Sequence, residues 1–289
     1  MTGIFAILGP GALGLSTAQW AAECGLQVRL LGRDLDHARQ GLQEVEQRWG
    51  VAMQKGALSP QAHEKARSRL QAAPFSLEAM ESVSTLLEAL PEDPGQKTLA
   101  LAMAAGWGGT DLLLLSGTSA LPISDLAEAA GIQKRLLGFH LFVPVPRMAV
   151  VEVAVPSGTP PSLVDQGRAL GLALRKRVVV VQDQPGFAAA RMALVQGLEA
   201  MRLLEAGAAT TEDLDALMTL GYGHPVGPLE LSDRIGLDLR LSIAEGLFRA
   251  SRNPRFEPPT LLREKVAQGE TGRKAGRGFY TWDPDGRRL

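Results

Sequence analysis

The first two thirds of the chain alternate short apolar runs with longer segments of mixed polarity. Each run is followed by a glycine, a proline or a polar residue. Runs of this kind are typical of strands that are buried on both faces of a parallel sheet and joined by crossover helices. They cover residues 4–8, 28–31, 84–90, 112–115 and 178–181. The pattern therefore predicts an α/β fold with a mostly parallel sheet in the N-terminal part of the chain.

The pattern changes after the turn sequence DQPG at residues 183–186. Beyond it, apolar residues recur with a period of about 3.6 and would lie on one face of a helix. That face carries Phe187, Ala190, Leu194, Leu198, Met201 and Leu204. We expect no strand in the last hundred residues, so we predict a sheet domain over residues 1–183 and an all-α domain over residues 184–289.

A charged helical segment, residues 33–70, interrupts the predicted sheet domain. It breaks at Lys55-Gly56, and Ser59 followed by Pro60 is typical of a helix N-terminus. We interpret the segment as two helices that form an exposed hairpin inserted in the sheet domain. An alternative is that Arg48, Lys55 and Lys65 contact phosphate groups of a substrate.

A glycine pattern, GPGALG at residues 9–14, lies between the first predicted strand and an alanine-rich helix. In this setting Gly9 would make a tight turn, Gly11 would let the backbone approach a pyrophosphate, and Gly14 would let helix and strand pack closely. The unpaired N–H groups at the helix start would face the phosphates. Strand, glycine loop, helix and strand in this order predict a Rossmann-type dinucleotide-binding domain over residues 1–183.

Residues 138–153, GFHLFVPVPRMAVVEV, are mostly apolar but contain His140 and Glu152. Pro144 and Pro146 cannot donate to a sheet ladder, so they should separate two strands. A carboxylate within an apolar run is costly to bury unless it is paired, and an imidazole that donates one ring N–H to it keeps its other nitrogen as a base. We therefore interpret His140 as a base and Glu152 as the group that orients it. Spacing alone leaves open a structural histidine in the core and a glutamate at a strand edge.

Composition narrows the classes of partner. The chain has 30 basic and 31 acidic residues among 289, so no basic excess favours a nucleic acid or an anionic membrane surface. Its one cysteine cannot form an internal disulfide, and no cluster has metal-ligand spacing. Because we find neither an apolar run of membrane-span length nor a signal-peptide pattern, we expect a cytoplasmic protein without a metal.

Seven ordered motifs extend almost from one end of the chain to the other, and together they resemble the L-3-hydroxyacyl-CoA dehydrogenase family, which includes 3-hydroxybutyryl-CoA dehydrogenases. They are GPGALG at 9–14, LEALPED at 87–93, SGTS at 116–119, GFHLFVPVPRMAVVEV at 138–153, DQPGF at 183–187, GYGHPVGPLELSDRIGLD at 221–238 and GRKAGRGFY at 272–280. The number and order of the motifs make the resemblance specific for the family.

The resemblance implies a Rossmann domain followed by a helical domain that forms a homodimer. It also implies an oxidoreductase that passes hydride from the 3-hydroxyl of an acyl-CoA to NAD. His140 matches the family's catalytic histidine, Glu152 its orienting glutamate and Ser119 its substrate-contacting serine. The residues that we assign to cofactor binding are Gly9, Gly11, Leu13, Gly14, Arg33, Glu92 and Lys97.

The sequence departs from the family pattern at four positions. Gly117, Val143 and Ala190 stand where the family has asparagine, which removes polar contacts to substrate or cofactor. Gly32 replaces the acid that follows the second strand and binds the ribose of NAD, and Arg33 could contact a 2′-phosphate. NADP is therefore as reasonable an expectation as NAD. The departures keep two further functions open, a dehydrogenase of another small hydroxy acid and a nucleotide-binding protein with little catalysis.

Overall fold

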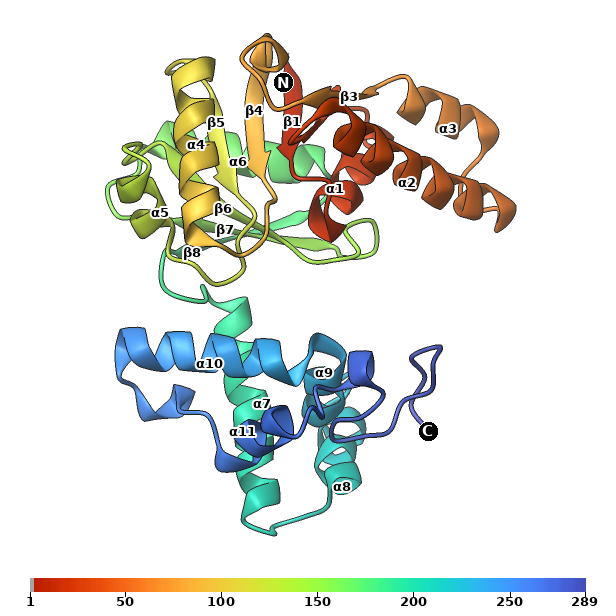
Figure 1. Cartoon of the computed structure of the whole chain (residues 1–289), viewed down its shortest axis with the longest axis vertical. Helices are drawn as coiled ribbons and strands as arrows, with labels where there is room; N and C mark the ends of the chain where they lie inside the picture. Colours follow the sequence, from red (N-terminus) through yellow and green to blue (C-terminus); the bar gives the residue numbers. More distant parts are fainter. Residues whose placement is uncertain (1–2) are drawn as a thin grey trace. The chain divides into compact units, whose positions relative to one another are not determined.

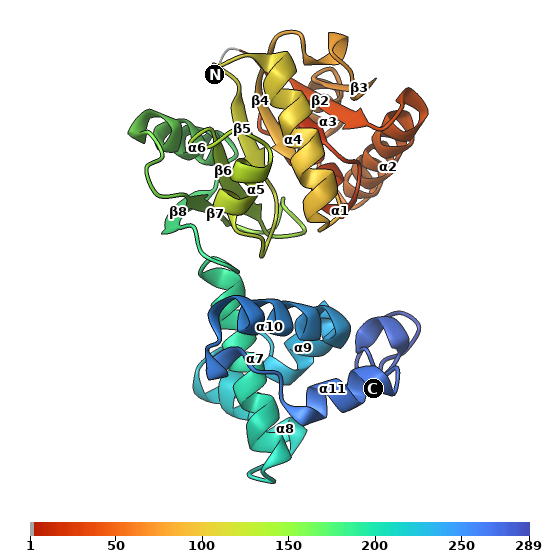
Figure 2. The ribbon, with the colours of Figure 1, turned by 60° about the vertical axis from the view of Figure 1, so that its left-hand side comes forward.

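The structure is a computed structural model that describes residues 3–289, and the chain divides into two compact units. The first ends at Phe187 and the second begins at Ala188. The first is coloured from red to green in Figures 1 and 2, and the second from green-cyan to blue.

An eight-stranded sheet forms the centre of the first unit, in the order β3-β2-β1-β4-β5-β6-β7-β8. All neighbouring strands run parallel except β6 and β7. The predicted Rossmann-type, mostly parallel sheet is therefore confirmed. The strands are β1 Ile4–Leu8, β2 Val28–Gly32, β3 Leu70–Pro74, β4 Val83–Glu88, β5 Leu113–Ser116, β6 Leu136–Leu141, β7 Val150–Val155 and β8 Arg177–Gln182.

Helices cover both faces of this sheet, as the alternation of side chains along β1 requires. Phe5 and Ile7 point into a core that is shared with α1 and α2, whereas Ala6 and Leu8 point into a second core that is shared with α4 and α5. The helices are α1 Ala12–Glu23, α2 Leu35–Gln54, α3 Pro60–Arg67, α4 Pro94–Gly108, α5 Ile123–Ala129, α6 Pro161–Ala173 and the short 3₁₀ turn η1 Glu78–Met80.

The inserted hairpin consists of α2 and α3, and Ser59 accepts a hydrogen bond from Ala62 N at the start of α3. The expectation of helix up to residue 70 is wrong at its end, because Leu70 begins β3 and pairs with Val28 of β2. This edge strand has the sequence LQAAP, and only its first residue is fully buried. A strand with a single large apolar residue gives no clear signal in the sequence.

The second unit is helical, and no strand beyond isolated bridges occurs in its residues 188–289, all of which the structure describes. Its helices are α7 Ala189–Glu205, α8 Thr211–Ala216, the π-helical turn η2 Leu217–Gly221, α9 Pro228–Ile235, α10 Leu237–Ser251 and α11 Thr260–Ala267, with 3₁₀ turns η3 Pro254–Phe256 and η4 Arg273–Ala275. The predicted all-α C-terminal part is confirmed.

The apolar face of α7 packs inside its own unit. Leu194, Leu198 and Met201 are buried in a core shared with α9, α10 and α11. The face therefore needs no partner to cover it. Exposed apolar side chains of this unit include Met192 on the other side of α7 and Leu217, Leu220 and Tyr222 on and after η2. In residues 3–289 no helix is long and apolar enough to cross a membrane.

Candidate active site

The carboxyl ends of β1, β4, β5 and β6 lie along one edge of the sheet, since these strands run parallel. Ligands of open α/β sheets bind beyond this edge. The glycine loop follows β1, Ser116 ends β5, and His140 is the second-last residue of β6. The topology thus places the predicted cofactor loop and the predicted base at the same edge of one unit.

The glycine loop is shaped by close contacts at two of its three glycines. Gly9 has φ +107°, and a Cβ there would lie 2.7 Å from the carbonyl oxygen of Ala89. A Cβ on Gly14 would lie 1.9 Å from the Gly9 carbonyl oxygen, whereas one on Gly11 would meet nothing within 4 Å. Gly11 is the N-cap of α1, and no side chain caps that helix. Open space beside uncapped N–H groups suits a phosphate group.

His140 and Glu152 lie directly opposite each other in the antiparallel β6–β7 pair. The distance from His140 Nδ1 to Glu152 Oε2 is 3.0 Å, and both side chains are largely buried. The Phe142 ring lies 4.5 Å from the imidazole, measured between ring centroids. Because Nδ1 faces the carboxylate, Nε2 is the nitrogen that can accept a proton from a ligand. The pair has the arrangement of a base and an orienting acid.

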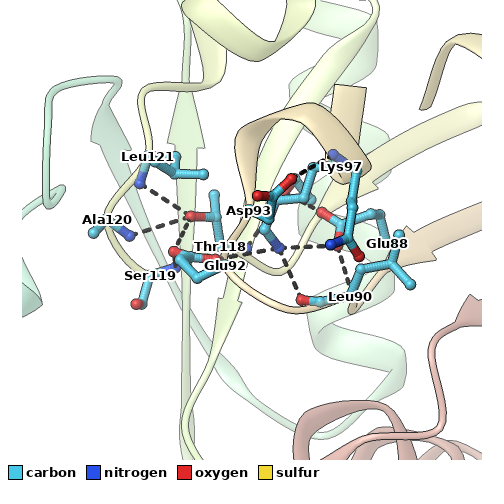
Figure 3. A network of polar contacts seen from close by, with 11 residues as sticks. Glu88, Leu90, Glu92, Asp93, Lys97, Thr118, Ser119, Ala120 and Leu121 are labelled. Carbon is cyan, nitrogen blue, oxygen red and sulfur yellow. Dashed lines mark hydrogen bonds and ion pairs between the residues drawn. The ribbon is translucent and has the colours of Figure 1, made fainter. Parts of the chain in front are cut away.

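Ser119 belongs to a polar network that joins the loops after β4 and β5 (Figure 3). Glu92 Oε1 accepts hydrogen bonds from the Ser119 N–H at 3.1 Å and from the Thr118 hydroxyl. The Thr118 hydroxyl oxygen in turn accepts from the N–H groups of Ala120 and Leu121. One carboxylate therefore fixes the backbone at Ser119.

Lys97 lies beneath this network and is only 1% exposed. Its Nζ contacts Glu88 Oε1 at 2.9 Å, the Leu90 carbonyl oxygen at 3.1 Å and Glu92 Oε2 at 3.2 Å. An ammonium group has three donors, so all of them have partners within the protein. Contact with the cofactor stays a prediction for Lys97, whose Nζ holds the Glu92 side chain and the loop after β4.

Glu88 is a member of the site that reasoning from the sequence missed. It is fully buried and also accepts hydrogen bonds from the Ser116 hydroxyl at 2.7 Å and the Leu90 N–H at 2.6 Å. The signal was present, since Glu88 is a carboxylate within an apolar run, as Glu152 is. Glu88 and Lys97 together anchor the carboxyl ends of β4 and β5.

The end of β2 has no room for a side chain at position 32. A Cβ on Gly32 would lie 2.6 Å from the Ala38 nitrogen. Asp34 caps α2, because its Oδ1 accepts from the His37 N–H at 2.7 Å, and that bond is the main reason why the pKa of Asp34 is lowered. Arg33 is exposed and pairs with Asp34 Oδ2 at 3.2 Å. Directly after β2 the chain thus carries an exposed guanidinium group at Arg33. The carboxylate of the next residue, Asp34, is bound to the His37 N–H and to Arg33.

The three positions without the family's asparagine lie in different surroundings. A Cβ on Gly117 would lie 2.7 Å from Leu13 Cδ2 and 3.0 Å from the Glu88 carbonyl oxygen, so packing opposes any side chain there. Val143 is about half exposed, and Ala190 lies in the first turn of α7 in the second unit. Within residues 3–289, no group of three or more His, Cys, Asp or Glu residues could hold a metal ion.

Comparison with known proteins gives concordant matches over almost the whole chain. The model of the 3-hydroxyacyl-CoA dehydrogenase NAD binding domain matches residues 5–184, and that of the 3-hydroxyacyl-CoA dehydrogenase C-terminal domain matches residues 186–282. A probable 3-hydroxybutyryl-CoA dehydrogenase of Bacillus subtilis is 33% identical over 277 residues, which is 96% of each chain.

Similar matches come from a mammalian relative and a solved structure. The mitochondrial hydroxyacyl-coenzyme A dehydrogenase of Sus scrofa is 34% identical over 288 residues, covering 96% of this chain and 90% of the relative. The crystal structure of (S)-3-hydroxybutyryl-CoA dehydrogenase from Ralstonia eutropha has a TM-score of 0.93 and 32% identity, covering 98% of this chain and 100% of that one.

Proposed function

The chain belongs to the 3-hydroxyacyl-CoA dehydrogenase family, and from that premise we propose that it oxidises the 3-hydroxyl of an acyl-CoA thioester to a ketone. Bound NAD would supply the hydride acceptor. The observation that carries the proposal is the His140–Glu152 pair, with its 3.0 Å contact, at the sheet edge that also carries the glycine loop. Gly9, Gly11, Leu13 and Gly14 form that loop and hold the pyrophosphate.

In the proposed reaction His140 Nε2 takes the proton of the substrate hydroxyl. The C3–H bond breaks as hydride leaves, and the electrons of the O–H bond form the C=O bond of the ketone. Glu152 stabilises the imidazolium that results and holds the ring in its tautomer. Ser119, fixed by Glu92, contacts the substrate, while Lys97 holds Glu92 in place.

Substrate class is tested by following the absorbance of reduced nicotinamide with (S)-3-hydroxybutyryl-CoA and with free 3-hydroxybutyrate and other small hydroxy acids. The proposal expects turnover with the thioester and little with the free acids. Turnover of free acids alone would favour a dehydrogenase of another small hydroxy acid, which the loss of amides at Gly117, Val143 and Ala190 supports. Nucleotide binding without turnover of any of these compounds would contradict both enzyme assignments.

We further propose that NADP(H) binds at least comparably to NAD(H). The support is the end of β2, where Gly32 offers no carboxylate to repel a 2′-phosphate and Arg33 is exposed. The Arg33→Ala variant should weaken NADPH binding about tenfold, as the loss of a charge-assisted hydrogen bond of about 1.5 kcal/mol predicts, and leave NADH binding unchanged. The control is Arg39→Ala, since Arg39 is also exposed and pairs only with Asp36. NADPH at least a hundredfold weaker than NADH in wild type would contradict the proposal.

A homodimer through the second unit is also proposed, with exposed Leu217, Leu220 and Tyr222 as its support. Sedimentation at micromolar protein should give a dimer, and Leu220→Arg should shift the equilibrium toward monomer. A wild-type monomer at that concentration would contradict this assembly.

A further inference from the structure

The irregular loop of residues 142–149 connects the strand of His140 to the strand of Glu152. Its prolines prevent ladder hydrogen bonds, so its backbone groups must bind elsewhere. Val145 is completely buried, and its N–H donates to the Ser16 hydroxyl oxygen of α1 at 2.8 Å. The carbonyl oxygens of Val145 and Met148 both accept from Lys176 Nζ, at 2.6 and 2.7 Å. Two side chains from outside the loop thus fix its backbone.

Lys176 directly precedes β8 and is 4% exposed. Its Nζ lies 4.5 Å from the centroid of the Trp20 ring. Burial lowers the pKa of this ammonium group. Trp20 is held in turn, because its Nε1 donates to the Leu174 carbonyl at 2.7 Å. Burying a cation costs free energy unless its N–H groups form hydrogen bonds. Here the ammonium group of Lys176 donates to two carbonyl oxygens of the loop.

Ser16 and Trp20 lie one turn apart on α1, the helix that begins in the glycine loop. The same helix that faces the pyrophosphate therefore also holds the loop of the His140 hairpin. At the loop's other end, the first residue, Phe142, packs its ring against the imidazole of His140. A displacement of the loop would move this ring, and with it His140, relative to the cofactor helix.

We propose that Lys176 is a positioning residue for the hydride-transfer reaction, which with Ser16 ties loop 142–149 to α1 and so sets His140 at a fixed distance from the bound cofactor. The inference rests on the proposed function. A misplacement of about 1 Å from a change remote from the chemistry can lower the rate on the order of a hundredfold. Lys176 acts through the loop whose carbonyl oxygens it binds.

The test compares Lys176→Met with Lys176→Arg, which keeps the cation and its donors. Lys176→Met should lower kcat per folded enzyme on the order of ten- to a hundredfold, with little change in KM or in the dissociation constant of NADH. Lys176→Arg should recover most of kcat. Ser16→Ala should lower kcat in the same direction, and its effect should not add to that of Lys176→Met, because both act on one loop. The control is Thr17→Val, which removes a neighbouring buried hydroxyl that bonds only to its own helix.

A second readout needs no substrate. The chain has four histidines, so the imidazole signal of His140 can be assigned by its loss in His140→Ala and followed by NMR. The signal should shift or broaden in Lys176→Met and stay unchanged in Thr17→Val. If wild type lacks dehydrogenase activity but the His140 signal responds to Lys176, the proposed function fails while the coupling of Lys176 to His140 stands.

The proposal is overturned if Lys176→Met lowers the melting temperature but leaves kcat and the His140 signal unchanged. Lys176 would then have a structural role only. If Lys176→Met does not fold, Ser16→Ala is measured in its place, with Lys176→Arg beside it. Normal turnover together with an unperturbed His140 signal in Ser16→Ala would then overturn the proposal.

Discussion

Lys97 in the first unit and Arg240 in the second are both almost completely buried, at 1% and 3% exposure, but their surroundings differ. Lys97 contacts two carboxylates and a carbonyl. Arg240 donates from Nη1 to the Ala193 carbonyl at 2.8 Å, and its Nε and Nη2 have no partner in the part of the chain that the structure describes. Gly197 leaves the space that the guanidinium fills, since a Cβ there would lie 3.1 Å from Arg240 Cζ.

Lys97 and Arg240 show that a buried cation has different consequences where carboxylates neutralise it and where they do not. In the first, buried ions hold together the loops beyond β4 and β5 and the hairpin of His140 and Glu152, so they organise the candidate site. In the second, burial lowers the pKa of Arg240 to about 10. A base whose pKa falls on folding is less stable in its charged form in the native protein, so at neutral pH the charge of Arg240 opposes folding.

The largest expected effect on stability is that of Lys97→Met. The substitution leaves Glu88 buried without its cation, and the loss of one partner from a buried ion pair costs about 3–5 kcal/mol. Denaturant unfolding, followed by a probe of the first unit, should show this loss. A change near zero would mean that the carboxylates of Glu88 and Glu92 are not held by Lys97.

The same substitution in the second unit, Arg240→Met, should have the opposite sign. Methionine fills irregular space well, and replacing a poorly satisfied buried charge by an apolar side chain is neutral or stabilises by about 1–4 kcal/mol. Denaturant unfolding of wild type and variant should therefore give an unchanged or raised free energy of unfolding. A loss comparable to that of Lys97→Met would show that Arg240 stabilises the second unit even though two of its nitrogen atoms have no partner, and would contradict the contrast with Lys97.

The smallest expected effect is a pH dependence at Asp233 in α9. Its carboxylate accepts from the N–H groups of Phe279 and Tyr280 and from Trp282 Nε1, but burial outweighs these bonds and raises its pKa above 3.8. A raised pKa means that the native state binds the proton more tightly than the unfolded state. The stability that Asp233 contributes is therefore complete below pH 3.8 and declines as the pH rises through the native pKa.

The direction of this pH dependence is checked by measuring the free energy of unfolding of wild type and Asp233→Asn at a series of pH values. The difference in unfolding free energy, wild type minus variant, should fall with rising pH and then become constant. A difference that grows with pH would mean that the three hydrogen bonds dominate and that the second unit also stabilises its buried charge.

The sequence predicted the parts of the molecule that depend on local patterns. The glycine loop, the parallel strands and the change to helical periodicity follow from spacing along the chain. The edge strand β3 was missed because Leu70 is its only large apolar residue. For α7, periodicity identified the face that is buried, but it could not tell that α9, α10 and α11 of the same unit cover it.

The candidate site was accessible from the sequence only where a polar residue interrupts an apolar run. Glu152 gave this signal, and its contact with His140 depends on a strand register that the sequence does not specify. Lys176 and Arg240 gave none, because a basic residue at the end of a strand or in an amphipathic helix is normally exposed. Their burial arises from residues distant in the chain, such as Ser16 and Trp20 around the loop that Lys176 holds.

We propose that His140 is the base of a hydride-transfer reaction in the first unit. The turnover of His140→Ala with (S)-3-hydroxybutyryl-CoA, measured together with the affinity for NADH, tests this role. Removal of a general base should lower kcat on the order of a hundred- to ten-thousandfold, whereas NADH affinity should stay near wild type because the proposed cofactor site is the glycine loop. Wild-type turnover in His140→Ala would mean that another group accepts the proton and would contradict the role of His140 as base.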